Sequence, residues 1–411
     1  MKLKPLIKDF LQSPTAKQVA SLYSVSMISI PITLVSSIVL TRNMSTVSFG
    51  DYKYILSICG LFASLLTFGF YQAASRVLLL TNDEVKSRKV YGASILLTFA
   101  FGLIMKLMLL LYTFTSHGSL LKEELLLIIP VCDVFLFGSM IGILLRAEKK
   151  IKLITHYKLG IVTIDLLFFI LLFYVFKHNS IKLVLIAYLI AQILCVIYVL
   201  IRNGFSFKGI KKILSEIWHQ EKIYGFHIYT GAVCSIGMQS LTPVLVGLFG
   251  QTNAGVGFYS LAMAISSPLA LIPVTVATVK YRDFTLSNRI NNKLTRVTLL
   301  MSLCAMIMII LLAYPFVTFF YGHDYIRVVP LALILSVGSL LYGFGDFFNY
   351  YFSAHGDGKL IRNIAIIVGI SGLIINLALV PFLDEYGASL ARVICGLIYL
   401  SVMLWSYKKV K

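Results

Sequence analysis

Long apolar segments separated by short polar ones repeat along the whole sequence. An α-helix crosses the core of a bilayer with about 20 consecutive apolar residues, and the strands of a membrane barrel would instead alternate apolar with polar positions. Backbone groups in lipid must be satisfied within helices or closed barrels, so these unbroken segments predict helices. Two sets of spans result, at 19–40, 54–75, 91–114, 125–145, 159–176 and 183–201, and then at 224–249, 257–279, 297–320, 328–352, 361–382 and 387–407.

The positions of the basic residues predict the orientation of these spans. Most of the 36 Lys and Arg residues lie in every second connection, within 1–17, 76–89, 146–158, 202–222, 280–296, 359–362 and 408–411. Short cytoplasmic connections of membrane proteins carry such an excess of positive charge. The sequence therefore predicts an all-α integral membrane protein of about twelve transmembrane helices, with both termini in the cytoplasm.

A basic connection in the middle of the chain predicts a division into two halves. Residues 207–218 within it combine apolar and basic positions in the manner of a helix that lies in the membrane interface. We expect a six-helix lobe at 1–201, a cytoplasmic amphipathic linker at 202–222 and a second six-helix lobe at 223–411. Each half repeats a Gly-x-Tyr sequence after its first span, at Gly50 and Gly257, which favours a parallel internal repeat.

Composition agrees with lipid as the main solvent of the chain. Of its 411 residues, 59% are hydrophobic and 13% charged, about half the charged fraction of a soluble domain. The net charge of +19 does not indicate a nucleic-acid partner, because the basic residues lie in the connections between spans. The six cysteines fall in apolar segments and form no Cys-x-x-Cys pair, so we expect neither a disulfide framework nor a metal site.

Transport of a substrate would have to draw on gradients rather than on ATP. The glycine-rich segment at 356–360 lacks the spacing and the hydroxyl of a phosphate-binding loop, and we expect no cofactor. The membrane potential has a suitable sign, because each negative charge that moves outward gains about 2.3 kcal/mol per 100 mV.

Several short motifs at helix ends resemble the polysaccharide-transporter family. They are Leu40-Thr41-Arg42 followed by Phe49-Gly50-x-Tyr52, Asn253–Ala262, Arg146-Ala147-Glu148, Asn376–Pro381 and Tyr386–Ala391. The resemblance runs through nearly the whole chain, and the best-known members of the family are O-antigen and capsule-unit flippases of the multidrug/oligosaccharidyl-lipid/polysaccharide superfamily.

The resemblance implies both a fold and an activity. Such proteins have two six-helix lobes around a central cavity, like the multidrug and toxin extrusion antiporters. They carry undecaprenyl-diphosphate-linked oligosaccharides from the cytoplasmic to the periplasmic leaflet of the bacterial inner membrane, for O-antigen, lipopolysaccharide or another surface polysaccharide. A polysaccharide polymerase and a chain-length regulator are then possible partners, beside the membrane lipids.

Polar residues within the spans are candidates for the cavity, because an ionisable group at the centre of a membrane helix costs about 2.5–3.5 kcal/mol. Three acids, Asp133, Asp165 and Asp346, are candidates for ion coupling, and the alternative for each is an ion pair that holds helices together. In the tenth span, Tyr342, Asp346, Asn349 and Ser353 form one polar stripe on a helix. Gln239 has a comparable position on the seventh span.

A diphosphate substrate needs cations, and the forked guanidinium of Arg fits phosphate oxygens. The candidates for this role are Arg42, Arg76, Lys106 and Arg392. Pro31 and Pro243 lie in the first span of each half and could be flex points for alternating access, with a static kink as the alternative.

Two other functions compete with the flippase. A cation-coupled antiporter for drugs or other small molecules would share the architecture, but it would more often carry an acid in its first span, and residues 19–40 contain none. A membrane-embedded polysaccharide polymerase would usually have a large outside loop with catalytic Arg or His residues, whereas the outside segments here are short. We therefore expect no enzyme and no catalytic residues.

Overall fold

The computed structural model describes residues 14–81, 83–287 and 289–409, without the side chains of 14–27, 116, 227, 232–239 and 282. These residues form helices, and no strand occurs among them, which confirms the all-α prediction. The described chain divides into two compact units. Unit 1 is built from Met1–Met44 and Ile55–Val233, and unit 2 from Ser45–Tyr54 and Cys234–Lys411.

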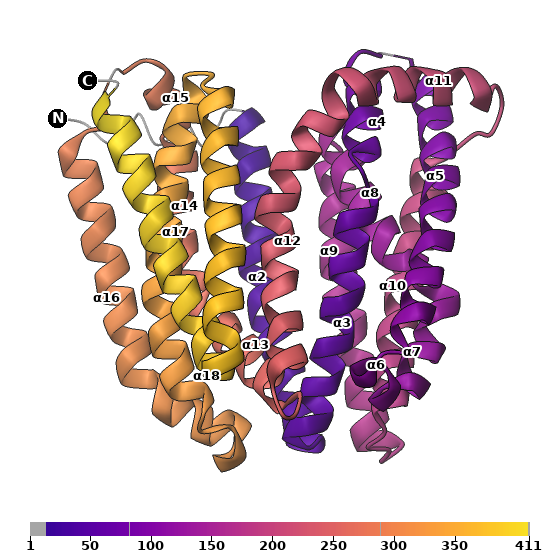
Figure 1. The fold of residues 1–411 in the computed structure, drawn as a ribbon. Coiled ribbons are helices and arrows are strands. Elements are labelled where there is room, and N and C mark those ends of the chain that lie inside the picture. Colours follow the sequence, from indigo (N-terminus) through magenta and orange to yellow (C-terminus); the bar gives the residue numbers. More distant parts are fainter. Residues whose placement is uncertain (1–13, 82, 288, 410–411) are drawn as a thin grey trace. The chain divides into compact units, whose positions relative to one another are not determined.

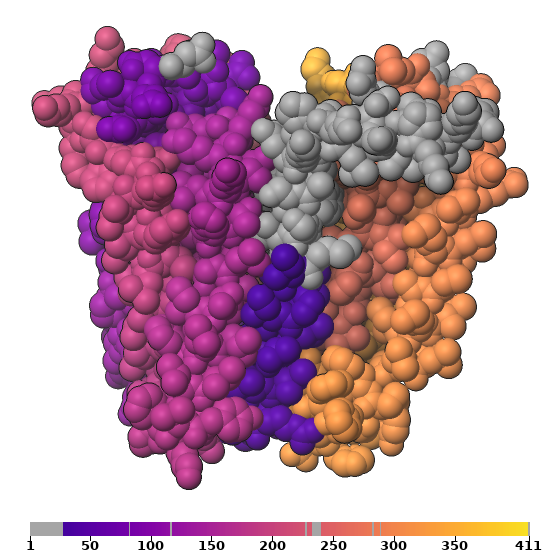
Figure 2. Space-filling model, turned by 180° about the vertical axis from the view of Figure 1, so that it is seen from behind, coloured from indigo at the N-terminus to yellow at the C-terminus, as the bar shows by residue number. Residues whose placement is uncertain are grey.

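Unit 1 contains the helices that precede and include the central connection (Figure 1). They are α2 (Pro14–Asn43), most of α3 (Thr46–Leu66), α4 (Phe70–Leu79), α5 (Glu84–Tyr112), α6 (Ser116–Leu120), α7 (Lys122–Ile128), α8 (Asp133–Ala147), α9 (Ile151–Ile170), α10 (Ile181–Asn203), α11 (Ile210–Gln220), the π-helix η3 (Glu221–Gly225) and the start of α12 (Phe226–Phe249). Helix α2 packs along α9, and its described residues lie beside α9 in Figure 2. Helices α7 and α8 form one bent pair with an angle of 49°.

The second predicted span, 54–75, is broken in the structure. Helix α3 ends at Leu66 and α4 begins at Phe70, because Phe68 and Gly69 between them have positive φ angles of 44° and 92°. A left-handed pair cannot continue a right-handed helix. The prediction of one continuous span was therefore wrong at this point, and apolar composition alone carried no sign of the break.

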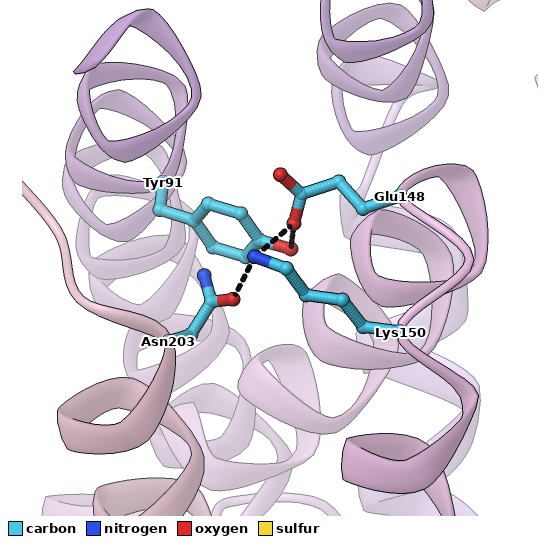
Figure 3. Close-up of polar contacts among 4 residues, drawn as sticks. All are labelled: Tyr91, Glu148, Lys150 and Asn203. Atoms are coloured by element: carbon cyan, nitrogen blue, oxygen red, sulfur yellow. Dashed lines mark hydrogen bonds and ion pairs between the residues drawn. The ribbon is translucent and has the colours of Figure 1, made fainter. Parts of the chain in front are cut away.

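A polar network joins four elements at one end of unit 1 (Figure 3). The Glu148 carboxylate accepts a hydrogen bond from the Tyr91 hydroxyl at 2.7 Å. It also forms an ion pair with the Lys150 ammonium at 2.9 Å. The Lys150 ammonium also donates to Asn203 Oδ1 at 2.6 Å. The network includes the Glu148 of the predicted Arg146-Ala147-Glu148 motif. It joins the basic connections at 146–158 and 202–222 to the start of the span at 91–114, and the side of the membrane that they face stays a prediction.

Unit 2 is organised around α17. It contains the rest of α12, α13 (Ala254–Ser266), α14 (Pro268–Val279), α15 (Tyr281–Thr285), α16 (Asn292–Phe316) with the π-helix η4 (Val317–Tyr321), α17 (Val328–Ala354) and α18 (Gly358–Lys409). Helix α17 packs against α13, α14, α16 and α18. Its aromatic residues Phe347, Tyr351 and Phe352 form a buried cluster with Phe284 and Tyr399. Asp384 is non-helical, with φ 47°, so α18 is two helices joined at a kink.

The two Gly-x-Tyr motifs of the predicted repeat lie against each other in unit 2. A Cβ on Gly50 would overlap the backbone carbonyl of Asn253, and a Cβ on Gly257 would lie 3.0 Å from the ring of Phe49. Asn253 Nδ2 also donates a hydrogen bond to Asp51 Oδ1 at 2.7 Å. Glycine is therefore required where these two helix starts approach.

The helices are long and apolar enough for a multi-pass membrane protein. Within the described residues, eight helices meet the length and composition of a membrane span, or nine if α7 and α8 count as one. Two shorter apolar helices at Ile28–Asn43 and Ser240–Phe249 and the kink in α18 add to these. The number twelve, the two six-helix lobes and the cytoplasmic termini stay predictions.

Candidate functional site

A cavity of about 720 Å³ lies inside unit 2, between α12, α13, α14, α17 and α18. Most of its wall is apolar or small, as expected inside a membrane helix bundle. The polar groups converge from α17 and α18 and include Tyr342, Asp346, Asn349, Asn376, Arg392 and Tyr399. A concave site with a few convergent polar groups is the usual form of a small-ligand or substrate site.

Helix α17 presents its polar stripe to this cavity. Tyr342, Asp346 and Asn349 all line it, as their helical spacing predicted. Ser353 is not among the lining residues and is exposed at the end of the helix. Three of the four positions of the stripe therefore belong to the site.

Tyr399 of α18 closes a hydrogen-bond chain with α17. Its hydroxyl donates to Asp346 Oδ1 at 2.9 Å and accepts from Asn349 Nδ2 at 3.0 Å. The chain fixes the acid and the amide relative to each other. A Cβ at Gly345 would overlap the Tyr399 ring, so only glycine at this position leaves room for the ring.

Arg392 brings a cation into the same cavity. Its guanidinium carbon lies 3.9 Å from the centroid of the Tyr342 ring, a cation–π contact. No ion pair of Arg392 with an acid is found among the described residues, and its buried Nε has no hydrogen-bond partner there. Gly338 lies opposite its side chain, and a Cβ there would be 3.0 Å from Arg392 Cγ. The guanidinium is thus available for an anionic group of a ligand.

Lys106 and Asp133 form an ion pair in unit 1, at 2.6 Å between α5 and α8. Gly102 makes room for it, because a Cβ at this position would overlap Asp133 Oδ1. For Asp133 the sequence left open either ion coupling or an ion pair that holds two helices together. The geometry is that of the ion pair. Neither residue belongs to the cavity of unit 2.

The remaining candidates of unit 1 are dispersed. Asp165 is buried on α9, and Arg42 is exposed in the last turn of α2. Arg76 is exposed on α4, with its guanidinium carbon 4.9 Å from the centroid of the Tyr224 ring.

The two prolines and Gln239 complete the predicted set. Pro31 lies inside α2, and Pro243 lies inside α12 and lines the cavity of unit 2. The Gln239 side chain lies outside the described residues. The flexing of either helix stays a prediction.

Sequence reasoning missed Tyr399 and Asn376. Tyr399 follows Arg392 by seven residues, with Cys395 between them, so a helical-face test on the last span would have grouped all three. Asn376 was noted only as part of a helix-end motif. Its Nδ2 donates to the Gly372 carbonyl at 2.8 Å, and its buried Oδ1 has no partner among the described residues.

A family model described as "Polysaccharide biosynthesis protein" matches residues 15–281, which is more than half of the chain. The chain belongs to this family. The family resemblance expected from the helix-end motifs is thereby confirmed. A comparison with curated proteins finds no match.

Solved structures resemble this family member in fold. A lipid II flippase, MurJ, in an inward closed conformation has a TM-score of 0.67 and 18% identity, over 93% of this chain and 87% of that one. An inward-facing multidrug resistance MATE transporter has a TM-score of 0.64 and 15% identity, over 96% and 98% of the two chains. At these identities the similarity shows that this chain shares their fold and nothing further.

Among the described residues, no group of three or more His, Cys, Asp or Glu side chains could hold a metal ion. The cavity can instead bind an anion at Arg392 and hydroxyl groups at Asn349, Asp346 and Tyr399. A carboxylate accepts hydrogen bonds from sugar hydroxyls, and the amide both donates and accepts.

Proposed function

We propose that this protein is a flippase for lipid-linked oligosaccharides. It carries undecaprenyl-diphosphate-linked repeat units of O-antigen or another surface polysaccharide from the cytoplasmic to the periplasmic leaflet of the inner membrane, by alternating access. The observation that carries this proposal is Arg392, a guanidinium without an ion pair among the described residues in a polar cavity of a polysaccharide biosynthesis family member.

The groups of the cavity suit the two chemical parts of this substrate. The Arg392 fork fits the diphosphate, because its donors match phosphate oxygens in pairs. Asp346, Asn349 and Tyr399 suit sugar hydroxyls. Arg42, Arg76, Lys106 and Gln239 would add to the path of the substrate, and Asp133, Asp165 or Asp346 would carry a coupled ion.

The conformational part of the proposal uses the predicted lobes. Residues 1–201 and 223–411 would be the lobes that alternate, 202–222 the cytoplasmic linker, and Pro31 and Pro243 the flex points. A polymerase and a chain-length regulator would then use the exported units in the periplasm.

Complementation of a deletion strain tests the flippase. Deleting the gene should trap lipid-linked repeat units on the cytoplasmic leaflet, and the wild-type gene should restore their export. Arg392→Gln should restore less than about a tenth of it, because one charge-assisted hydrogen bond contributes about 1.5–3 kcal/mol. The matched control is Arg362→Gln on the same helix α18, where the arginine is exposed. Normal export in the deletion strain without another flippase would overturn the proposal.

A cation-coupled drug antiporter is the second candidate. The similarity to multidrug MATE structures and the carboxyl of Asp346 in the cavity favour it. In proteoliposomes an antiporter would expel a cationic dye when a sodium or proton gradient is applied, and Asp346→Asn would abolish this activity. We expect no such flux. Dye export that requires Asp346 would contradict the flippase proposal and support the antiporter.

A further inference from the structure

A buried carboxyl lies outside the cavity and outside the candidate spans. Glu221 is the first residue of η3, the π-helix between α11 and α12, and only 7% of its surface is exposed. Its Oε2 atom has no hydrogen-bond partner among the described residues. Burial of an ionised carboxylate without a partner is strongly unfavourable, so this group needs a physical explanation.

Two glycines form a cradle around this carboxyl. A Cβ on Gly225 would overlap Glu221 Oε2 and would lie 2.8 Å from the Gly69 carbonyl oxygen. A Cβ on Gly69 would lie 2.8 Å from Glu221 Oε1 and 2.6 Å from the Gly225 carbonyl oxygen. The two backbones therefore meet at the carboxyl. The carbonyl oxygens of both glycines belong to this cradle, and a carbonyl oxygen can accept from the O–H of a protonated acid but finds no donor on a carboxylate.

The cradle holds the start of α12 against the break between α3 and α4. Gly69 belongs to this break, with φ 92°, and Gly225 directly precedes α12. The Tyr229 hydroxyl donates to the Leu65 carbonyl, which the end of α3 leaves without a helical partner. The Phe68 and Tyr229 rings are also 6.0 Å apart. The chain passes from unit 1 to unit 2 within α12, after Val233.

Two cations near Glu221 lie over aromatic rings. Helices α4 and α11 pack against η3. On α4, Arg76 lies over the Tyr224 ring. Lys222 of η3 itself lies over the Trp218 ring at 5.7 Å.

Helix α11 brings the other titratable groups, Lys211, Lys212, Glu216 and His219. Glu216 is paired with Lys86 of α5 at 2.7 Å. None of the ion pairs between described residues includes Glu221. Burial therefore acts on Glu221 without a compensating cation, and it raises the pKa of this carboxyl to about 7.

We propose that Glu221 is a proton-binding site whose protonated carboxyl holds the start of α12 against the α3–α4 break. Loss of the proton leaves a buried carboxylate in the glycine cradle without an O–H to donate, and this releases α12. If the protein is the flippase proposed above, proton binding and release at Glu221 would be linked to the movement of α12. This link rests on the proposed function, but proton binding itself does not.

Tryptophan fluorescence tests proton binding without any substrate. Trp218 lies one turn before Glu221 and contacts Phe70 at 5.6 Å between ring centroids, and Trp405→Phe removes the other of the two tryptophans. In this background, the emission of the full-length protein in lipid nanodiscs should change with pH, with a midpoint near 7. Glu221→Gln, which mimics the protonated acid, should abolish the transition.

Matched controls separate Glu221 from its neighbours. Glu216→Gln and His219→Gln should keep the transition, since neither residue contacts the glycine cradle. A transition that persists in Glu221→Gln, or that disappears in His219→Gln, would overturn the proposal. If Glu221→Gln does not fold, Glu221→Asp takes its place. This variant keeps a carboxyl, but its shorter side chain draws the carboxyl out of the cradle. An unchanged midpoint of the fluorescence transition in Glu221→Asp would also count against the proposal. Because no transport is measured, these outcomes are independent of the flippase assay.

Discussion

Gly50 and Gly257 show how a single residue type sets the closest contacts of this fold. Both lie in motifs by which the chain resembles the family, and the structure places them against each other. A methyl group at such a position has no space, because the neighbouring atoms are backbone rather than the flexible end of a side chain. The motif is thus explained by packing between helix starts.

Gly50→Ala should destabilise unit 2 by about 1–3 kcal/mol, the usual effect of overpacking. The added Cβ would overlap the Asn253 carbonyl. The control is Gly358→Ala, where a Cβ would meet nothing within 4 Å. Thermal unfolding in detergent should show a lower Tm for the first variant only, and equal values would contradict the packing explanation.

The ion pair of Lys106 and Asp133 gives a second prediction. Asp133→Asn or Lys106→Met alone should cost up to about 3 kcal/mol, because each leaves a partly buried charge unpaired. The double variant should recover part of this loss. A double-mutant cycle measures it, and additive losses would show that the pair contributes no coupling. A stable double variant without transport would instead assign the pair a role in transport.

Glu221 makes stability depend on pH in a defined direction. Its pKa in the folded protein is about 7, above the ordinary value of 4.5, so folding takes up a proton between these values. Its contribution is fully present below pH 4.5 and is lost as the pH rises through about 7. The Tm of the wild type should fall over this interval relative to that of Glu221→Gln. A constant difference between the two would contradict the raised pKa.

At the scale of elements, the structure explains how short helix ends become rigid. The network of Tyr91, Glu148, Lys150 and Asn203 joins four helices (Figure 3). It connects α5 with the end of α8, the start of α9 and the end of α10. A separate backbone bond from the Ser206 N–H to the Arg88 carbonyl, at 2.9 Å, attaches the start of the central connection to α5. These contacts hold unit 1 together at the end where α11 lies (Figure 1).

Tyr91→Phe tests the network directly. The Tyr91 ring is buried, and its hydroxyl donates to a carboxylate. Loss of a hydrogen bond to a charged group should cost about 1.5–3 kcal/mol. Tyr198→Phe is the control, because the exposed Tyr198 has its hydroxyl 3.2 Å from Nδ1 of the exposed His156 and not beside a buried carboxylate. Similar denaturation midpoints for both variants would exclude a structural role of the network.

At the scale of the whole molecule, the membrane potential is the energy source to test. A diphosphate that moves outward gains about 2.3 kcal/mol per charge and 100 mV. In proteoliposomes, flipping of a lipid-linked oligosaccharide should accelerate when the potential is positive on the receiving side and slow when an ionophore collapses it. A rate that follows only the pH gradient would assign the driving force to protons.

Features that depend on local composition could be predicted from the sequence. Apolar segments of sufficient length must be helices in lipid, and a stripe such as Tyr342, Asp346 and Asn349 must lie on one helical face. For the same reason the family motifs could be recognised at helix ends, and the family match over residues 15–281 includes those that lie before residue 281. These features need no knowledge of which helices are neighbours.

Which polar groups meet could be seen only in the folded structure. Asp346 and Tyr399 are 53 residues apart and form one hydrogen-bond chain, whereas Lys106 and Asp133 pair far from the cavity. The break at Gly69 and the cradle around Glu221 arise where two backbones approach. Such contacts depend on the packing of distant helices, and hydropathy carries no information about that packing, because lipid-facing and helix-facing apolar residues look alike in the sequence.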